Sequence, residues 1–238
     1  MTHDAPIAEI ESLVAVSLPK GTASVTAWHA APENAWAWLA VAHGAGGNAQ
    51  HPFFDGLIAA AHAAGIATVR FNFPYSQAGR RLPGPASHAL ATWAAIAEFT
   101  PTGELPLFAS GKSYGGRMAS MAAAESMIDP AGLVYLGYPL HPPGEPSKLR
   151  TAHLAGVAQP QLFVSGTADP FVDPPEQLET AVASCQNARL EWIAGGGHSF
   201  EVKGAKRSPD EIAAGLVALI EPWMRAIGPS RSPAFHGD

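Results

Sequence analysis

The stretch LPLFASGKSYGGRM, residues 105–118, matches two motifs at once, and the choice between them decides the fold. Gly111-Lys112-Ser113 resembles the end of a phosphate-binding loop, G-x-x-x-x-G-K-[ST]. Residues 111–115 also fit G-x-S-x-G, the sharp turn that presents a nucleophilic serine. Both motifs join a strand to a helix, so only the neighbouring residues can separate a nucleotide-binding protein from a hydrolase.

Those neighbours favour the serine turn. A phosphate-binding loop would need its first glycine at position 106, but this residue is Pro106, which has no amide hydrogen to offer a phosphate. Gly111 and Gly115 supply the small residues that the serine turn requires two positions before and after Ser113. The apolar run LPLFAS precedes the turn, and an alanine-rich segment typical of a closely packed helix follows it.

Composition restricts the class of protein. The chain has 238 residues, of which 47% are hydrophobic and 14% charged, and this predicts a folded globular domain. Its net charge of −6 gives no basic surface for nucleic acid or an anionic membrane. Cys185 is the sole cysteine, so an internal disulfide and a cysteine-based zinc site are excluded. The N-terminus lacks the pattern of a signal peptide and no apolar run reaches membrane-spanning length, so we expect a cytoplasmic protein.

Short apolar runs alternate with amphipathic or alanine-rich segments along the chain. We predict strands near residues 24–29, 36–42, 67–73, 105–110, 133–138, 161–165 and 189–193. We predict helices near residues 52–64, 86–99, 114–127, 174–184 and 208–226. This alternation favours an α/β fold with a mainly parallel central sheet and helices on both faces. We expect a single domain over residues 1–227 and a flexible C-terminal tail over 228–238.

A serine nucleophile needs a base, and the base needs an acid that orients it. In this class of fold the acid and then the histidine follow the serine, on loops after later strands. Asp169 follows the predicted strand 161–165, and His198 follows the predicted strand 189–193. The competing acids are Asp173, Glu176 and Asp210. The first fits a helix cap, and Asp210 fits the first turn of the last helix.

The reaction also needs backbone N–H groups that stabilise a developing oxyanion. One donor is expected on Tyr114, directly after the serine, and the second on Ala45 in the glycine-rich turn HGAGG. We predict a structural role for His43, because it precedes the serine in the chain.

With these residues identified, the chain resembles the α/β-hydrolase superfamily, and within it a group of small hydrolases related to dienelactone hydrolase. Similar domains occur in eukaryotic testis-expressed and chromatin-complex proteins. The matching segments are HGAGGNAQHPF (43–53), RFNFPYSQAGRRLP (70–83), GKSYGGRMAS (111–120), GLVYLGYPLHPPG (132–144), LFVSGTADPF (162–171) and GGHSF (196–200). The resemblance implies a triad of Ser113, Asp169 and His198. It departs from the better-characterised dienelactone hydrolases at the nucleophile, which is cysteine in those enzymes.

The segment between residues 140 and 160 is too short for a large helical lid, so we expect an open site for a small or extended substrate. Its lining is predicted from strand ends as Phe73, Tyr75, Tyr138 and His141. Arg80 and Arg81 are candidates for binding a substrate carboxylate. The histidines show no H-E-x-x-H spacing, so we expect no metal site.

The sequence therefore predicts a serine hydrolase that acts on an ester, thioester or related acyl bond of a small molecule without a cofactor. Two alternatives stay open, a catalytically silent interaction domain with the same fold and an acyltransferase in which an alcohol replaces water. The acyl group, the leaving group and the oligomeric state are not specified by the residues.

Overall fold

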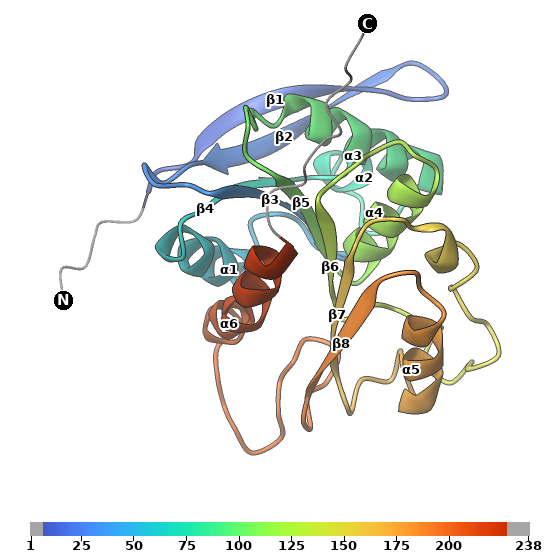
Figure 1. Ribbon diagram of the computed structural model, residues 1–238. Helices are drawn as coiled ribbons and strands as arrows, with labels where there is room; N and C mark the ends of the chain where they lie inside the picture. The colour runs from blue at the N-terminus through green and yellow to red at the C-terminus, as the bar shows by residue number, and fades with distance from the viewer. Residues whose placement is uncertain (1–6, 228–238) are drawn as a thin grey trace, which may run out of the picture.

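A computed structural model describes residues 7–227, which are built around an eight-stranded sheet (Figure 1). The strands are β1 (Ile10–Ser17), β2 (Thr22–Ala30), β3 (Ala37–Ala42), β4 (Ile66–Phe71), β5 (Leu107–Lys112), β6 (Gly132–Leu136), β7 (Gln161–Gly166) and β8 (Ala188–Ile193). Their order is β1-β2-β4-β3-β5-β6-β7-β8. The pairs β1–β2 and β2–β4 are antiparallel, and the other neighbours are parallel. The predicted tail over 228–238 lies outside the described residues.

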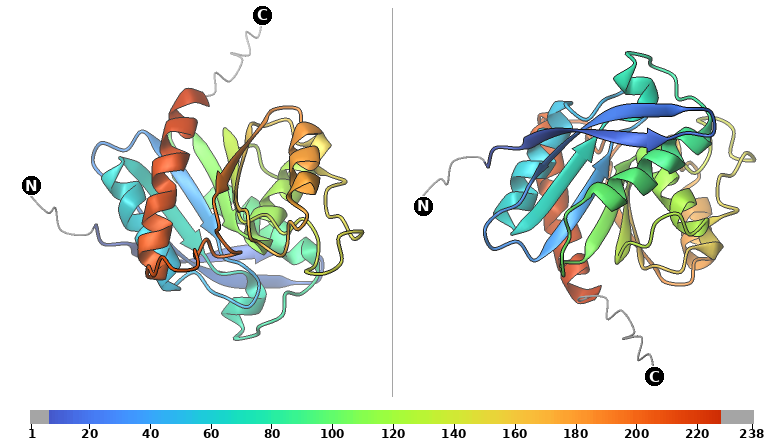
Figure 2. Two further views of the ribbon diagram at one scale, coloured as in Figure 1. Left: turned by 90° about the horizontal axis from the view of Figure 1, so that it is seen from below. Right: turned by 90° about the horizontal axis from the view of Figure 1, so that it is seen from above.

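Helices cover both faces of the sheet. They are α1 (Pro52–Ala63), the short α2 (Pro74–Gln77), α3 (Ala86–Phe99), α4 (Tyr114–Ala124), α5 (Pro175–Ala183) and α6 (Pro209–Ile227). Helices α1 and α6 lie against each other on one face, and α3, α4 and α5 lie on the opposite face (Figures 1 and 2). This arrangement confirms the predicted α/β class with a mainly parallel sheet.

The central strands are apolar throughout because both of their faces are buried. In β3, Leu39 and Val41 pack into the core shared with α1 and α6, whereas Ala40 and Ala42 face the core on the side of α4. Small residues on that side allow α4 to approach the sheet closely, and α4 packs against them with alanines of its own, such as Ala119. The result is a rigid sheet with a helix seated tightly against its centre.

Strand β1 was not predicted from the sequence. Only Val14 and Val16 are fully buried in this strand, and its alternate residues are exposed, with Leu13 at 72% exposure. β1 pairs with β2 alone and forms the edge of the sheet, so it lacks the continuous apolar run that identified the central strands. The short helix α2 was also missed.

Strands β3, β5, β7 and β8 are parallel and therefore place their carboxyl ends at one rim of the sheet. The loops that carry Ala45, Ser113, Asp169 and His198 follow these four strands. Between β6 and β7, residues 137–160 contain one short 3₁₀ turn, Leu154–Gly156, which is consistent with the absence of a large lid. Open α/β sheets bind ligands at this rim.

Candidate active site

Ser113 occupies a strained turn between β5 and α4. Its φ of 50° and ψ of −113° are unusual for a residue with a side chain. The backbone N–H of Ser113 donates to the carbonyl of Leu136 at 2.9 Å, which fixes the turn to the neighbouring strand. This is the geometry that the G-x-S-x-G motif adopts where it presents a serine above a sheet.

The glycines of the motif are required by close backbone contacts. A Cβ on Gly111 would lie 2.2 Å from the backbone nitrogen of Gly116 in α4. A Cβ on Gly115 would lie 2.6 Å from the carbonyl oxygen of Ala42 and 2.7 Å from that of His43. Because these are backbone atoms of a packed sheet and helix, a methyl group at either glycine forces the elements apart.

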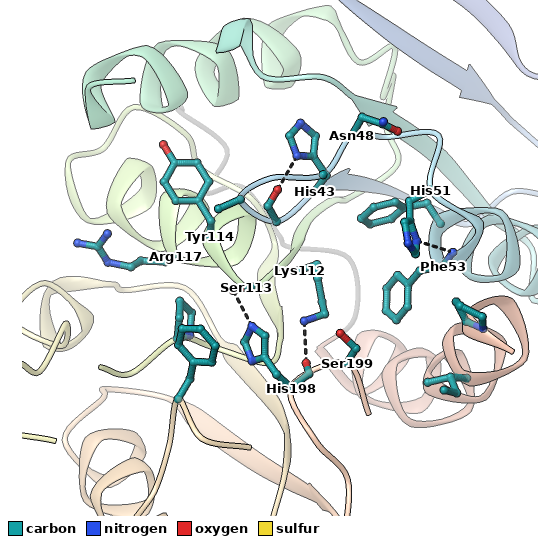
Figure 3. Close-up of a pocket in the computed structure, with 18 of the residues that line it drawn as sticks. His43, Asn48, His51, Phe53, Lys112, Ser113, Tyr114, Arg117, His198 and Ser199 are labelled. Atoms are coloured by element: carbon teal, nitrogen blue, oxygen red, sulfur yellow. Dashed lines mark hydrogen bonds between the residues drawn. The ribbon is translucent and has the colours of Figure 1, made fainter. Parts of the chain in front are cut away.

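A chain of hydrogen bonds joins Ser113, His198 and Asp169. His198 Nε2 lies 2.9 Å from Ser113 Oγ (Figure 3), and His198 Nδ1 lies 2.7 Å from Asp169 Oδ2. Asp169 is 1% exposed, and its second oxygen accepts from the N–H of Phe171 at 2.8 Å. A buried carboxylate beside Nδ1 favours the tautomer with its proton on that nitrogen, so Nε2 is free to accept from the serine hydroxyl. Of the acids weighed from the sequence, Asp169 is the one in contact with His198.

The loops that carry the acid and the histidine are joined to each other. Ala168 N–H donates to the carbonyl of Gly196 at 2.9 Å, and Gly195 N–H donates to Thr167 Oγ1 at 2.8 Å. The ring of Phe171 lies against the imidazole of His198 with a centroid separation of 4.1 Å. These contacts hold the imidazole in one orientation relative to Asp169.

Lys112 connects the histidine loop to β5. Its Nζ donates to the backbone carbonyl of His198 at 2.7 Å, and it lies 5.7 Å from the ring centroid of Phe200. Burial lowers the pKa of Lys112 to about 8, against the opposing charges of Asp169 and Glu201. No role for Lys112 was predicted from the sequence. Its position directly before the serine was the available signal, but the contact to residue 198 depends on the folded loops.

The second predicted oxyanion donor, Ala45, lies in a backbone turn that the side chains of His43 and Tyr75 fix by hydrogen bonds. The carbonyl of Gly44 accepts from Tyr75 Oη at 3.2 Å and lies 2.8 Å from His43 Nδ1. The other ring nitrogen of His43 accepts from Phe73 N–H at 3.2 Å, so the Nδ1 proton points to Gly44. In a planar trans peptide the following N–H, on Ala45, points opposite to that carbonyl.

This turn lies close to the nucleophile, since a Cβ on Gly44 would be 3.6 Å from Ser113 Cβ. Tyr114 is the first residue of α4, where backbone N–H groups have no partner within the helix. His43 is 1% exposed, and burial lowers its pKa to about 4, so it is neutral and holds backbone groups at pH 7.

A cavity of about 780 Å³ surrounds Ser113 and His198. Figure 3 shows Tyr114 and Arg117 on one side of the serine and His51 and Phe53 on the other. Arg150 belongs with Arg117, whose charge acts on it, and lies 3.5 Å from the Pro139 carbonyl. Phe54 and Ile212 pack in the same cluster as Phe53. The lining also includes Phe171, Glu201 and Arg207. The serine therefore has cavity-lining residues on both sides.

The predicted substrate-binding residues differ from this lining, and none of the six, all within the described part of the chain, contributes to it. Phe73 and Tyr75 are buried because they turn inward and pack on His43, with ring centroids 5.1 and 5.7 Å away. They support the Gly44 turn from behind and do not face the cavity.

Of the other four, two are buried in the core and two are exposed on a loop. Tyr138 is buried and its hydroxyl donates to the carbonyl of Arg150 at 2.7 Å. His141 is buried with Nδ1 beside the carbonyl of Pro142 at 2.8 Å. Arg80 and Arg81 are exposed on the loop after α2. The sequence placed Tyr138 and His141 near a strand end correctly but did not show which way their side chains turn.

Among residues 7–227, no group of three or more histidine, cysteine, aspartate or glutamate side chains is arranged to hold a metal ion. Over the same residues, none of the helices combines the length and the apolar character needed to cross a bilayer.

Comparison with solved structures shows the fold. Dienelactone hydrolase from Anabaena variabilis ATCC 29413 is 23% identical, with a TM-score of 0.68 over 92% of this chain and 98% of that one. An α/β serine hydrolase without lid from Xanthomonas campestris is 20% identical, with a TM-score of 0.65 over 90% and 94%. Est1E from Butyrivibrio proteoclasticus is 15% identical, with a TM-score of 0.66 over 90% and 99%.

The family comparison covers most of the chain. Residues 35–224 match the family model described as an alpha/beta hydrolase domain. This range contains the turn after β3 that carries Ala45, together with Ser113, Asp169 and His198. This confirms the resemblance stated from the sequence motifs. The chain belongs to the alpha/beta hydrolase domain family.

Proposed function

We propose that the protein is a serine hydrolase that cleaves an ester, thioester or related acyl bond of a small molecule. The observation that carries this proposal is the hydrogen-bonded sequence Ser113–His198–Asp169, with separations of 2.9 and 2.7 Å. It lies at the rim where α/β sheets bind ligands and opens into a cavity with room on both sides of the serine.

In the proposed acylation step, Ser113 Oγ attacks the substrate carbonyl while His198 Nε2 takes the hydroxyl proton. The tetrahedral intermediate then collapses, the bond to the leaving group breaks, and His198 returns the proton to that group. Asp169 stabilises the imidazolium and keeps its proton on Nδ1. Water repeats the sequence on the acyl-serine, which releases the acid and restores the hydroxyl.

The backbone N–H groups of Tyr114 and Ala45 would receive the oxyanion. The fixed Gly44 carbonyl supports this role for Ala45, because its direction is set by His43 and Tyr75 before any substrate arrives. Donors oriented in advance need no reorganisation during the reaction, and the loss of one costs about 2.7–4 kcal/mol in similar sites. None of these steps uses a cofactor.

Solved structures with this fold include proteins described as a dienelactone hydrolase, a serine hydrolase and an esterase domain from Rhodothermus marinus. They support acyl-bond hydrolysis as the class of reaction. The serine at position 113 and the two-sided cavity support esters or thioesters as the class of substrate.

The test is labelling with a fluorophosphonate probe, followed by turnover of short 4-nitrophenyl esters. We expect an adduct on the native protein and none on Ser113→Ala, with turnover lost in the same variant. Absence of a Ser113-dependent adduct would contradict the proposal and favour the interaction domain. Labelling with acyl product diverted to added glycerol would assign the protein as an acyltransferase.

A further inference from the structure

Two arginines that line the cavity, Arg117 and Arg150, lie close enough for their charges to interact, and neither has a carboxylate partner among residues 7–227. Arg117 lies on α4 one turn after the serine, and its backbone N–H donates to the Ser113 carbonyl at 3.1 Å. Arg150 lies on the segment between β6 and β7. Among the ion pairs formed by residues 7–227, neither side chain takes part.

The guanidinium of Arg117 has unused hydrogen-bonding capacity. Its Nε is buried and has no partner among the described residues. A buried donor without a partner costs free energy, and the Nη groups of Arg117 are not buried and form no hydrogen bond among residues 7–227, so they are the donors that a ligand can reach. Figure 3 shows the side chain of Arg117 on the same side of the serine as Tyr114.

The backbone of Arg150 is held firmly, while its guanidinium is nearly free. The N–H of Arg150 donates to the Leu140 carbonyl at 2.8 Å, and its carbonyl accepts from Tyr138 Oη at 2.7 Å. The guanidinium itself makes one long contact, 3.5 Å to the carbonyl of Pro139. The rim of the cavity thus presents an anchored arginine whose donors are available.

The two positive charges act on each other. Burial and the charge of Arg117 lower the pKa of Arg150, and the same charge adds to burial in lowering the pKa of His153 to about 4. Glu145 opposes this effect on Arg150, but Glu145 is itself paired with Lys148. Arginine keeps its proton under all ordinary conditions, so this part of the cavity carries uncompensated positive charge.

We propose that Arg117 and Arg150 bind a carboxylate at the far end of the substrate, making the protein selective for acidic esters or thioesters. This inference rests on the proposed function of Ser113. Guanidinium groups bind carboxylates through paired, charge-assisted hydrogen bonds. Four residues of helix rise by roughly 6 Å, so a few methylene groups would separate this carboxylate from the reacting carbonyl. Pro139, beside the Arg150 guanidinium, and Phe171, against the His198 ring, line the cavity and supply apolar surface for those methylenes.

The experiment compares two esters with the same six-carbon acyl chain, 4-nitrophenyl hexanoate and the mono-4-nitrophenyl ester of adipic acid. They differ in a terminal methyl or carboxylate group. We expect kcat/KM of the native protein to favour the adipate ester at least tenfold. In Arg117→Gln and Arg150→Gln the ratio of kcat/KM for the adipate ester to kcat/KM for the hexanoate ester should fall toward one. Arg80→Gln removes the same charge from an exposed loop outside the cavity and should keep the native preference.

Binding is measured separately, so that the two proposals can fail independently. Monomethyl adipate and methyl hexanoate are titrated calorimetrically into Ser113→Ala, with and without the additional change Arg117→Gln. We expect measurable binding of the adipate ester that weakens at least tenfold in the double variant. Turnover of both esters without preference overturns the carboxylate site and leaves the hydrolase intact. No turnover, with Arg117-dependent binding of monomethyl adipate, rejects the hydrolase and keeps the carboxylate site.

Discussion

Replacing Gly115 with alanine should damage the proposed oxyanion site more than the fold. The added Cβ would lie 2.6 Å from the Ala42 carbonyl oxygen and 2.7 Å from that of His43. Ordinary van der Waals contact begins at 3.4 Å, so the end of β3 must withdraw from α4 by about 0.7–0.8 Å. The turn that carries Ala45 continues directly from those carbonyls and moves with them.

Two effects on stability oppose each other in this variant. Alanine in a helix gains up to about 1 kcal/mol over glycine, whereas overpacking a tight contact costs about 1–3 kcal/mol. We expect a net loss in the free energy of unfolding of at most about 2.5 kcal/mol. Loss of an oxyanion donor costs about 10²–10³ in rate, so its partial displacement should lower kcat about ten- to a hundredfold.

The assay is kcat and KM on a short 4-nitrophenyl ester, together with urea unfolding of the same preparations. Gly156→Ala is the matched control, because a Cβ there meets nothing within 4 Å and the residue lies outside the cavity lining. A Gly115→Ala protein whose kcat stays within twofold of that control would refute the link between the β3–α4 contact and oxyanion binding.

Three other changes test the rest of the site. Asp169→Asn removes the group that sets the tautomer of His198, so kcat should fall by about 10⁴ with KM little changed, measured by steady-state kinetics and contradicted by a loss below tenfold. Lys112→Met removes the ammonium group that donates to the backbone carbonyl of His198. Because the pKa of Lys112 is about 8, kcat of the native protein should decline above pH 8 as Lys112 loses its proton. The pH profile of kcat for the variant should lack that decline. Burial lowers the pKa of His43 from 6.5 to about 4, so the unfolded chain binds a proton at pH values where the folded protein does not. The contribution of His43 should therefore lower the free energy of unfolding by about 3 kcal/mol between pH 7 and pH 4. Urea unfolding of His43→Gln should show a smaller fall over the same range.

Strand order and chain position were sufficient to predict which residues meet at the serine. Asp169 follows the apolar run LFVSG, whereas His198 follows the half-buried strand β8, which contains Arg189 and Glu191. Parallel strands bring their carboxyl ends to one rim whatever the details of the loops. Pro106 excluded the phosphate-binding alternative by simple chemistry. These arguments depend on backbone direction alone, which hydrophobic patterning specifies well.

The lining of the cavity could not be predicted in the same way. The side chain of a residue at a strand end turns toward the core or the solvent according to its neighbours. Tyr75 turns inward because its ring packs on His43 and its hydroxyl donates to the Gly44 carbonyl. Arg117 and Arg150 come together from a helix and a distant loop, which no local pattern relates. Lys112 was missed for the same reason, since its partner lies 86 residues away along the chain.

The cross-links around His198 have a consequence for how the protein meets its substrate. One set joins its loop to the segment carrying Asp169, and Lys112 joins it to β5, the strand that precedes Ser113. These hydrogen bonds run between protein groups alone, so the fold itself positions the three residues of the proposed triad, and the free energy of substrate association need not be spent on organising them. Complexes with inhibitors should therefore superpose on the free form at these three residues, and adaptation to different substrates is left to the flanking side chains.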